Sequence, residues 1–211
     1  IVVHHDKPEL LNICLQSIVV MSAMNNYELI VVDNNSGKET QEYLDVIETE
    51  GVKVIRNKEN VYWSKAANQG AAAADPYSKY LIFMHCDTVV LNPSWIDLMI
   101  NVAVGKKSGL VGMQLGQYWV QRQHIQYLHE WCLMMSRPCW EACGPWPEEL
   151  PIVGHSFILS LRANTKGFNP ASVGNSIVHH YKVLSMSAMQ FDRMSQEAVL
   201  QVSKMIPAAI G

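Results

Sequence analysis

Tyr80-Leu-Ile-Phe-Met-His85-Cys86-Asp87-Thr88 is a short apolar run that stops at a carboxylate and a hydroxyl. A run of this kind predicts a buried β-strand. In open α/β sheets, ligands bind in the crevice beyond the carboxyl ends of the strands, which makes Asp87 a candidate functional residue. An Asp at such a position can also simply cap the next turn. Several other strand-like runs in the chain end in Asp, Asn or His, and this favours a shared polar site.

The segments around this run alternate between strand-like and helix-like patterns. We predict helices over 8–22, 36–48, 64–74, 93–104 and 155–166, and further strands over 1–3, 29–32, 52–55, 109–113 and 176–180. Asp6 with Glu9, and Ser36 with Glu39, resemble capping boxes, and Gly167 suits the C′ position of a helix. The alternation predicts an α/β fold with a mixed, mainly parallel sheet and helices on both faces.

Composition indicates a globular chain, and its length fits one large α/β domain or two small ones. The chain has 211 residues, 49% of them hydrophobic, and a mean hydropathy of +0.02. We expect a single domain over 1–211, with one half over 1–113, a second half over 114–185 and a C-terminal amphipathic helix within 186–211. Because the chain starts inside a predicted strand, we expect that it was taken from a longer protein with further domains.

Charge and hydropathy exclude two classes of partner. The net charge is −3, from 16 basic and 19 acidic side chains, and no basic run is present. We therefore expect no nucleic-acid partner. The apolar runs are much shorter than the ~20 residues of a membrane-spanning helix, so we expect no membrane span.

The five cysteines are an odd number at uneven spacing, which favours reduced thiols and a cytoplasmic location. His129, Cys132, Cys139 and Cys143 could also form a zinc site, but their spacing matches no common zinc module. The alternative is that these cysteines are small packing residues.

Segment 114–149 is expected to be irregular. It holds four of the six tryptophans, at 119, 131, 140 and 146. Aromatic rings beside a polar crevice can stack on sugars, and they can equally fill a core.

A set of linked motifs gives the chain a resemblance to a known family, from Ile1 to about Lys182. They are Val31-Val32-Asp33-Asn34-Asn35-Ser36, Asn60-x7-Asn68-Gln69-Gly70, Phe83-Met84-His85-Cys86-Asp87-Thr88 with Asn92-Pro93-x-Trp95, Trp131-Cys132-Leu133-Met134, Cys143-Gly144-Pro145-Trp146-Pro147-Glu148-Glu149, Gly154-His155-Ser156 before Leu161-Arg162-Ala163, and Val178-His179-His180. In order and spacing they resemble the family-2-like nucleotide-sugar glycosyltransferases of the GT-A (Rossmann-like) fold.

The resemblance implies a metal-dependent hexosyltransferase that moves a sugar from a nucleotide diphosphate sugar, with UDP favoured, to a glycan or glycoprotein. Asp87 matches the last carboxylate of the family's DxD-type motif, and a late-strand His supplies a further metal ligand. Because neighbouring strand residues face opposite ways, only one of His179 and His180 should face the metal, and we favour His180. Mn²⁺ suits a site with imidazole ligands, and Mg²⁺ is the alternative. The implied donor-binding residues are His4, Asp6, Asp33, Asn60, Lys65, Asn68, His85 and Asp87, and the implied acceptor-side residues are Trp131, Trp146, Glu149 and His155.

Two departures from the family pattern bear on mechanism. His85 stands where the first DxD acid is usual, and Gly154-His155-Ser156 lacks the carboxylate that deprotonates the acceptor in inverting members. His155 could act as the base, since the unperturbed pKa of His is suitable. Alternatively no protein base is used, as in retaining transferases of this fold. We predict catalytic roles for Asp87 and His155 and slightly favour retention of configuration.

Two other functions compete with this prediction. The first is a module that binds a nucleotide sugar or carbohydrate without catalysis, within a larger protein of glycan synthesis. The second is a nucleotidyltransferase, which requires a Gly-rich, basic loop after the first strand, and His4-His5-Asp6-Lys7-Pro8 is not such a loop. No dinucleotide-binding fingerprint follows that strand either, which argues against a dehydrogenase.

Overall fold

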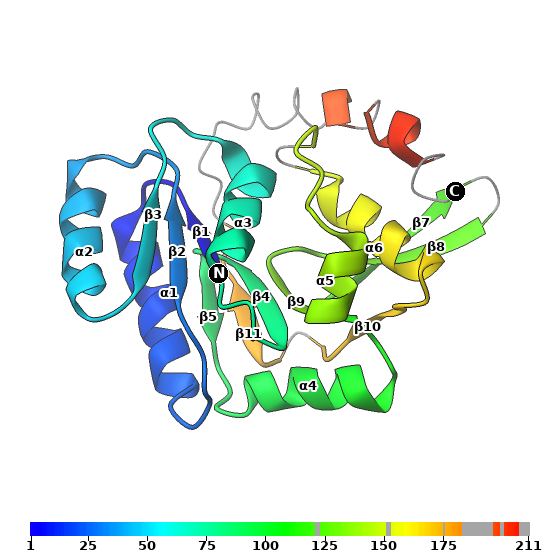
Figure 1. The fold of residues 1–211 in the computed structure, drawn as a ribbon, viewed down its shortest axis with the longest axis horizontal. Helices are drawn as coiled ribbons and strands as arrows, with labels where there is room; N and C mark the ends of the chain where they lie inside the picture. The colour runs from blue at the N-terminus through cyan, green and yellow to red at the C-terminus, as the bar shows by residue number, and fades with distance from the viewer. Residues whose placement is uncertain (121–122, 151–152, 175, 183–195, 199–200, 207–211) are drawn as a thin grey trace.

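A computed structural model describes residues 1–120, 123–150, 153–174, 176–182, 196–198 and 201–206 (Figure 1). Its centre is a seven-stranded sheet in the order β10-β6-β9-β4-β1-β2-β3. Only β9 runs antiparallel to its neighbours, and the other pairs in this sheet are parallel, as predicted for a mixed, mainly parallel sheet. The strands are β1 (Val2–His4), β2 (Ile30–Asp33), β3 (Lys53–Arg56), β4 (Tyr80–His85), β6 (Leu110–Gly112), β9 (Cys132–Ser136) and β10 (Pro170–Ser172).

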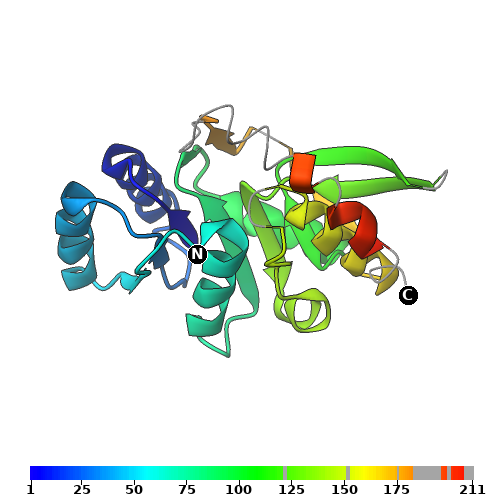
Figure 2. The same ribbon diagram turned by 90° about the horizontal axis from the view of Figure 1, so that it is seen from above.

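Helices cover both faces of this sheet, which confirms the predicted architecture (Figures 1 and 2). Successive strand residues point to opposite faces, so Val2 packs in one core cluster and Val3 in the other. The first cluster includes side chains of α1 (Pro8–Met21), α2 (Lys38–Thr49) and α4 (Trp95–Gly105). The second includes side chains of α3 (Tyr62–Ala73), α5 (Arg137–Cys143) and α6 (His155–Thr165).

Two small antiparallel pairs lie outside the main sheet. Strand β5 (Thr88–Val90) pairs with β11 (Val178–His180), and β7 (Leu115–Val120) forms a hairpin with β8 (Gln123–Leu128). Figures 1 and 2 show the hairpin at the opposite end of the molecule from α2. The β5–β11 pair matters more for the candidate site, because it places Val178–His180 beside the residues that follow β4.

Helix α3 lies close against the sheet at Gly70. A Cβ atom there would lie 2.4 Å from Cγ2 of Ile1 and 3.2 Å from Cγ2 of Val32. Only the absence of a side chain allows this approach, and the neighbouring Ala66, Ala67 and Ala71 are also small and buried. Trp63, at the N-terminal end of the same helix, contacts His85 at the carboxyl end of β4.

Three local predictions were wrong. Segment 114–149 is not irregular, since it contains β7, β8, β9 and α5. The two predicted capping boxes do not form, because Lys7 and Gly37 occupy the N-cap positions and neither makes a side-chain capping bond. Asp6 and Ser36 join their two loops instead: the Asp6 N–H donates to Ser36 Oγ at 2.8 Å, and the Gly37 N–H donates to Asp6 Oδ1 at 2.8 Å.

Two predicted features lie near the end of the chain. Gly167, with φ of +81°, follows the C-cap residue of α6, as predicted for a C′ glycine. Of the C-terminal helix predicted within 186–211, residues 186–195, 199–200 and 207–211 lie outside the described part, while 196–198 and 201–206 are helical. Within the described ranges, no helix combines the length and apolar character that crossing a bilayer would require.

Candidate functional site

The candidate site lies where β4 ends and β11 returns. The register of the antiparallel pair places His180 opposite Thr88 and His179 opposite Val89, and the Tyr181 N–H donates to the Asp87 carbonyl at 2.9 Å. This register turns the His180 side chain to Asp87, whereas His179 is exposed and packs against Tyr181. Of the two histidines expected as alternative metal ligands, His180 is the one beside the carboxylate.

Three side chains converge at this point. His180 Nε2 lies 3.2 Å from Asp87 Oδ1, and His85 Nδ1 lies 3.9 Å from the same oxygen. One potential ligand atom from each residue lies within 4.8 Å of the other two, and within the described ranges no other group of three or more His, Cys, Asp or Glu residues does so. Two imidazole nitrogens and one carboxylate oxygen suit a first-row divalent ion such as Mn²⁺, with further positions left for oxygen ligands.

His85 is suited to ligation by its protonation state. Burial lowers the pKa of its imidazole to about 4, and the nearby Glu130 and Asp87 carboxylates only partly oppose this shift. The ring is therefore neutral near pH 7 and offers a lone pair, which a protonated imidazole cannot do. The His at the first DxD position thus remains compatible with a metal site.

Aromatic rings surround the three polar side chains. Trp131 stacks on His180 with a centroid distance of 5.1 Å and an interplanar angle of 12°, and Trp63 meets the edge of His85 at 4.4 Å. Trp63 also stacks on His155 at 6.3 Å. These contacts connect the metal-ligand candidates with the start of α6.

The expected sugar-binding role of Trp146 does not fit its position. Its ring is 0% exposed and packs edge-on against Phe83, Trp63 and His155, so in this structure it belongs to the core. Trp131 is also mostly buried, and its ring is occupied by His180. Glu149 is exposed, three positions beyond Trp146.

Glu130 belongs to this site, although sequence analysis did not select it. It lies between β8 and β9, and its Oε2 accepts a hydrogen bond from Ser156 Oγ at 2.8 Å. Its Oε1 lies 3.6 Å from Nε2 of His155, which is itself only 1% exposed. The only signal in the sequence was a lone carboxylate directly before the Trp131 motif.

His155 is therefore poorly placed for the direct catalytic role that was expected of it. Both of its ring nitrogens are buried, and its ring lies between Trp63 and Trp146. An acceptor hydroxyl has no exposed surface through which to reach it in this structure.

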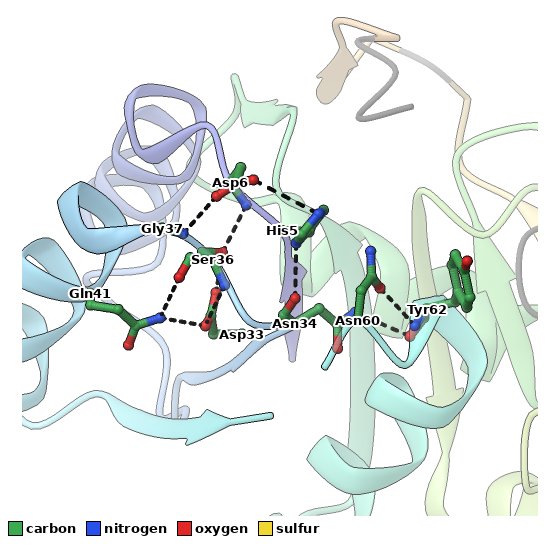
Figure 3. A network of polar contacts seen from close by, with 9 residues as sticks. All are labelled: His5, Asp6, Asp33, Asn34, Ser36, Gly37, Gln41, Asn60 and Tyr62. Atoms are coloured by element: carbon green, nitrogen blue, oxygen red, sulfur yellow. Dashed lines mark hydrogen bonds and ion pairs between the residues drawn. The ribbon is translucent and has the colours of Figure 1, made fainter. Parts of the chain in front are cut away.

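The loops after β1 and β2 form a second polar network, which Figure 3 shows. The buried carboxylate of Asp33 accepts hydrogen bonds from Ser36 Oγ, from the Ser36 N–H at 3.2 Å and from Gln41 Nε2 at 2.7 Å. His5 Nδ1 donates to the Asn34 carbonyl at 2.9 Å. Asp33, expected to contact the nucleotide, thus organises its own loop in this structure.

Other expected donor-binding residues divide into buried and accessible ones. His4 is 1% exposed, and Asn68 uses its amide to hold Trp146 and Glu148, at 2.9–3.0 Å. Neither is free to contact a nucleotide in this arrangement. Asn60 accepts from the Tyr62 N–H at 2.9 Å, while Asp6 and Lys65 are exposed.

The cysteines follow the packing interpretation. Cys132, Cys139 and Cys143 are buried and reduced, and with His129 they do not form a metal-ligand group among the described residues. Burial raises the pKa of the Cys14 thiol to about 11 and raises the pKa of the Cys132 thiol further, so both remain protonated near neutral pH.

Comparison with known proteins identifies the family of this chain and structures of similar fold. Residues 1–145 match the model of the family described as glycosyl transferase family 2. Over 222 aligned residues the chain is 23% identical to the O-antigen biosynthesis protein RfbC of Myxococcus xanthus, covering 85% of this chain and 17% of that protein. It is 31% identical over 113 residues to the uncharacterized protein y4gI of Sinorhizobium fredii, covering 52% of this chain and 12% of that one. The chain thus spans less than a fifth of the length of these relatives.

Solved structures share the fold at low identity. A mannosyltransferase from Pyrobaculum calidifontis, solved with GDP-Man and Mn²⁺, aligns with a TM-score of 0.76 and 13% identity over 98% of this chain and 63% of that one. Glucosyl-3-phosphoglycerate synthase from Mycobacterium tuberculosis, solved with Mn²⁺, UDP and phosphoglyceric acid, aligns with a TM-score of 0.66 and 14% identity over 94% and 74%. With its GT-A fold and a family match over residues 1–145, the chain belongs to glycosyl transferase family 2.

Proposed function

We propose that this domain transfers a hexose from a nucleotide diphosphate sugar to a glycan acceptor with the help of a divalent metal. The observation that carries the proposal is the group of His85, Asp87 and His180 at the carboxyl end of β4, in a chain of glycosyl transferase family 2. A nucleotidyltransferase or dehydrogenase lacks support, because the loop after β1 has neither of the Gly-rich patterns that those enzymes use.

Asp87, His180 and His85 would hold the metal, and Mn²⁺ fits this mixture of nitrogen and oxygen donors. When bound, such an ion stabilises the negative charge that develops on a departing diphosphate. Three protein ligands suffice for this role because the phosphate oxygens of the donor are ligands themselves. The aromatic contacts of Trp63 with His85, and of Trp131 with His180, would keep both imidazoles in orientation.

UDP-sugars are the favoured donors, with GDP- and dTDP-sugars as alternatives. Support comes from solved structures of similar fold, which contain GDP-Man with Mn²⁺ or UDP with Mn²⁺. Asp6 lies in the loop after β1 and Lys65 lies in the first turn of α3, and both exposed side chains would meet the nucleotide. A glycan acceptor is supported by the role in O-antigen biosynthesis that the name of the Myxococcus relative states.

Calorimetry and thermal shift with UDP-, GDP- and dTDP-hexoses test the proposal, each with Mn²⁺ and with EDTA. One nucleotide should bind in a metal-dependent way and raise the melting temperature by mass action. The same donors are then incubated with a panel of aryl hexosides, and the glycosylated product is detected by mass spectrometry. No nucleotide-sugar binding would overturn the proposal, and metal-dependent binding without turnover would favour the non-catalytic module.

A further inference from the structure

No residue in Gly154-His155-Ser156, at the start of α6, carries a carboxylate, but the carboxylate of Glu130 lies beside this segment. Glu130 reaches this point from the turn between β8 and β9, and its Oε2 accepts from Ser156 Oγ at 2.8 Å. Its Oε1 lies 3.6 Å from His155 Nε2. Residues far apart in the sequence therefore place an acid beside Gly154-His155-Ser156.

The surroundings of Glu130 keep this carboxylate ionised. Burial alone would raise the pKa of the Glu130 carboxyl, but the neighbouring His155 outweighs this effect and leaves the pKa below its usual range. The N-terminal end of α6 also favours a negative charge. The side chain is 21% exposed, in contrast to His155 at 1%, so Glu130 is the accessible member of the pair.

Glu130 is also adjacent to the metal-ligand candidates without being one of them. The carbonyl of the next residue, Trp131, accepts from the His85 N–H at 3.0 Å, and the Trp131 ring stacks on His180. The potential ligand atoms that cluster come from His85, Asp87 and His180 alone among the described residues. Glu130 is thus an ionised, partly exposed carboxylate next to the candidate metal site, and the resemblance assigns no role to it.

The geometry points to Glu130 as the general base that accepts the proton of the acceptor hydroxyl, held in place by Ser156 and His155. This inference rests on the proposed transferase function. In the step, the acceptor oxygen bonds to the anomeric carbon, and the bond from that carbon to the diphosphate breaks with its electron pair on the leaving oxygen. The hydroxyl proton passes to Glu130.

Two consequences distinguish this inference from the expectation drawn from the sequence. His155 becomes a positioning residue, since it touches Glu130 and is shielded from the acceptor. A single displacement assisted by a protein base also inverts the configuration at the anomeric carbon, whereas the sequence favoured retention.

The test compares Glu130→Gln, which keeps the size of the side chain and removes its basicity, with Glu141→Gln at an exposed position on α5. With the donor and aryl hexoside that the panel identifies, Glu130→Gln should lower the transfer rate by roughly 10²–10⁴-fold. Donor affinity and Mn²⁺ affinity, measured by calorimetry, should stay within about twofold of the parent, and Glu141→Gln should match the parent throughout.

A thiol acceptor distinguishes a base from a residue with a purely structural role, because the thiol would restore the transfer rate only if Glu130 acts as a base. Replacing the attacked hydroxyl of the aryl hexoside by a thiol should recover most of the loss in Glu130→Gln, because a thiol with a pKa of about 8.5 ionises without a protein base. Anomeric configuration of the product is read by NMR on the parent protein. This second measurement does not depend on whether the variant folds.

An inverted product with thiol rescue supports the inference. A retained configuration, or a Glu130→Gln rate within about threefold of the parent, overturns it while leaving the transferase function intact. A loss of Mn²⁺ affinity in Glu130→Gln would also overturn it, because Glu130 would then be a metal ligand. No nucleotide-sugar binding by the parent would instead mean that the transferase proposal itself had failed.

Discussion

His180 Nε2 lies 3.2 Å from Asp87 Oδ1 because the antiparallel pairing of β5 with β11 sets His180 opposite Thr88. The adjacent His179 is opposite Val89 and faces solvent. Two neighbouring histidines of identical chemistry are therefore in different environments, and they form a matched pair for testing the metal site.

We predict that His180→Ala lowers Mn²⁺ affinity by more than about tenfold, since it removes one of three protein ligands. His179→Ala should leave the affinity unchanged. Titration calorimetry in the presence of UDP measures both. Equal losses of Mn²⁺ affinity in the two variants would show that the β5–β11 register does not determine which histidine binds the metal.

Asp87→Asn should remove metal-assisted donor binding, and EDTA should have the same effect on the parent protein. The amide keeps the shape of the side chain but loses the charge that attracts a divalent ion. Asp97→Asn, at an exposed position on α4, is the control. Donor binding that persists in EDTA would mean that a basic side chain such as Lys65, and not a metal ion, balances the negative charge of the diphosphate.

Asp33→Ala should destabilise the protein as well as weaken nucleotide binding. The substitution leaves Ser36 Oγ, the Ser36 N–H and Gln41 Nε2 without their common acceptor, at a cost of about 1–3 kcal/mol in the free energy of unfolding. Urea unfolding measures the loss, and Gln41→Ala, which leaves both hydrogen bonds from Ser36 to Asp33 in place, should cost less. An unchanged unfolding curve would mean that this network contributes no stability.

Asn68→Ala should loosen the segment that carries Trp146. Its side chain accepts from the Trp146 N–H and donates to the Trp146 carbonyl and to Glu148 Oε1. We expect a loss of about 1–3 kcal/mol together with a weaker near-UV circular dichroism signal from tryptophan. Asn60→Ala loses a single bond and should keep that signal. An unaltered spectrum in Asn68→Ala would contradict the anchoring role.

Stability should fall as the pH drops from about 6.5 to about 4, partly because of His4. Burial lowers the pKa of this His to about 4, so over that range the unfolded chain binds a proton that the folded chain does not. Above pH 6.5 His4 is neutral in both states and does not lower the free energy of unfolding. As the pH falls from 6.5 to about 4, protonation of His4 in the unfolded chain lowers that free energy progressively. His4→Gln should therefore show a flatter pH dependence of the free energy of unfolding.

Urea unfolding in EDTA at several pH values between about 7 and about 4.5 measures the effect of His4→Gln. His85 also has a lowered pKa and shifts stability in the same direction, so some pH dependence should remain. The exposed His179→Gln provides the control. Identical slopes in the parent protein and His4→Gln would contradict the prediction.

Much of the fold was readable from local patterns. The alternation of apolar strands and amphipathic helices predicted a mainly parallel sheet covered on both faces, and Asp87 was correctly placed at the end of a buried strand. Such features depend on side-chain periodicity and on residues close in sequence, and a sequence displays both directly.

Long-range pairing decided the rest. The register of β11 on β5 separates His180 from His179, and the insertion of β9 between β4 and β6 turns a segment expected to be irregular into the middle of the sheet. The same fold brings Glu130 to Ser156 and buries His155 and Trp146, two residues whose chemistry had suggested contact with the acceptor. Contacts between distant segments depend on which strands pair and in what register, and the side-chain periodicity within one segment does not identify its partner.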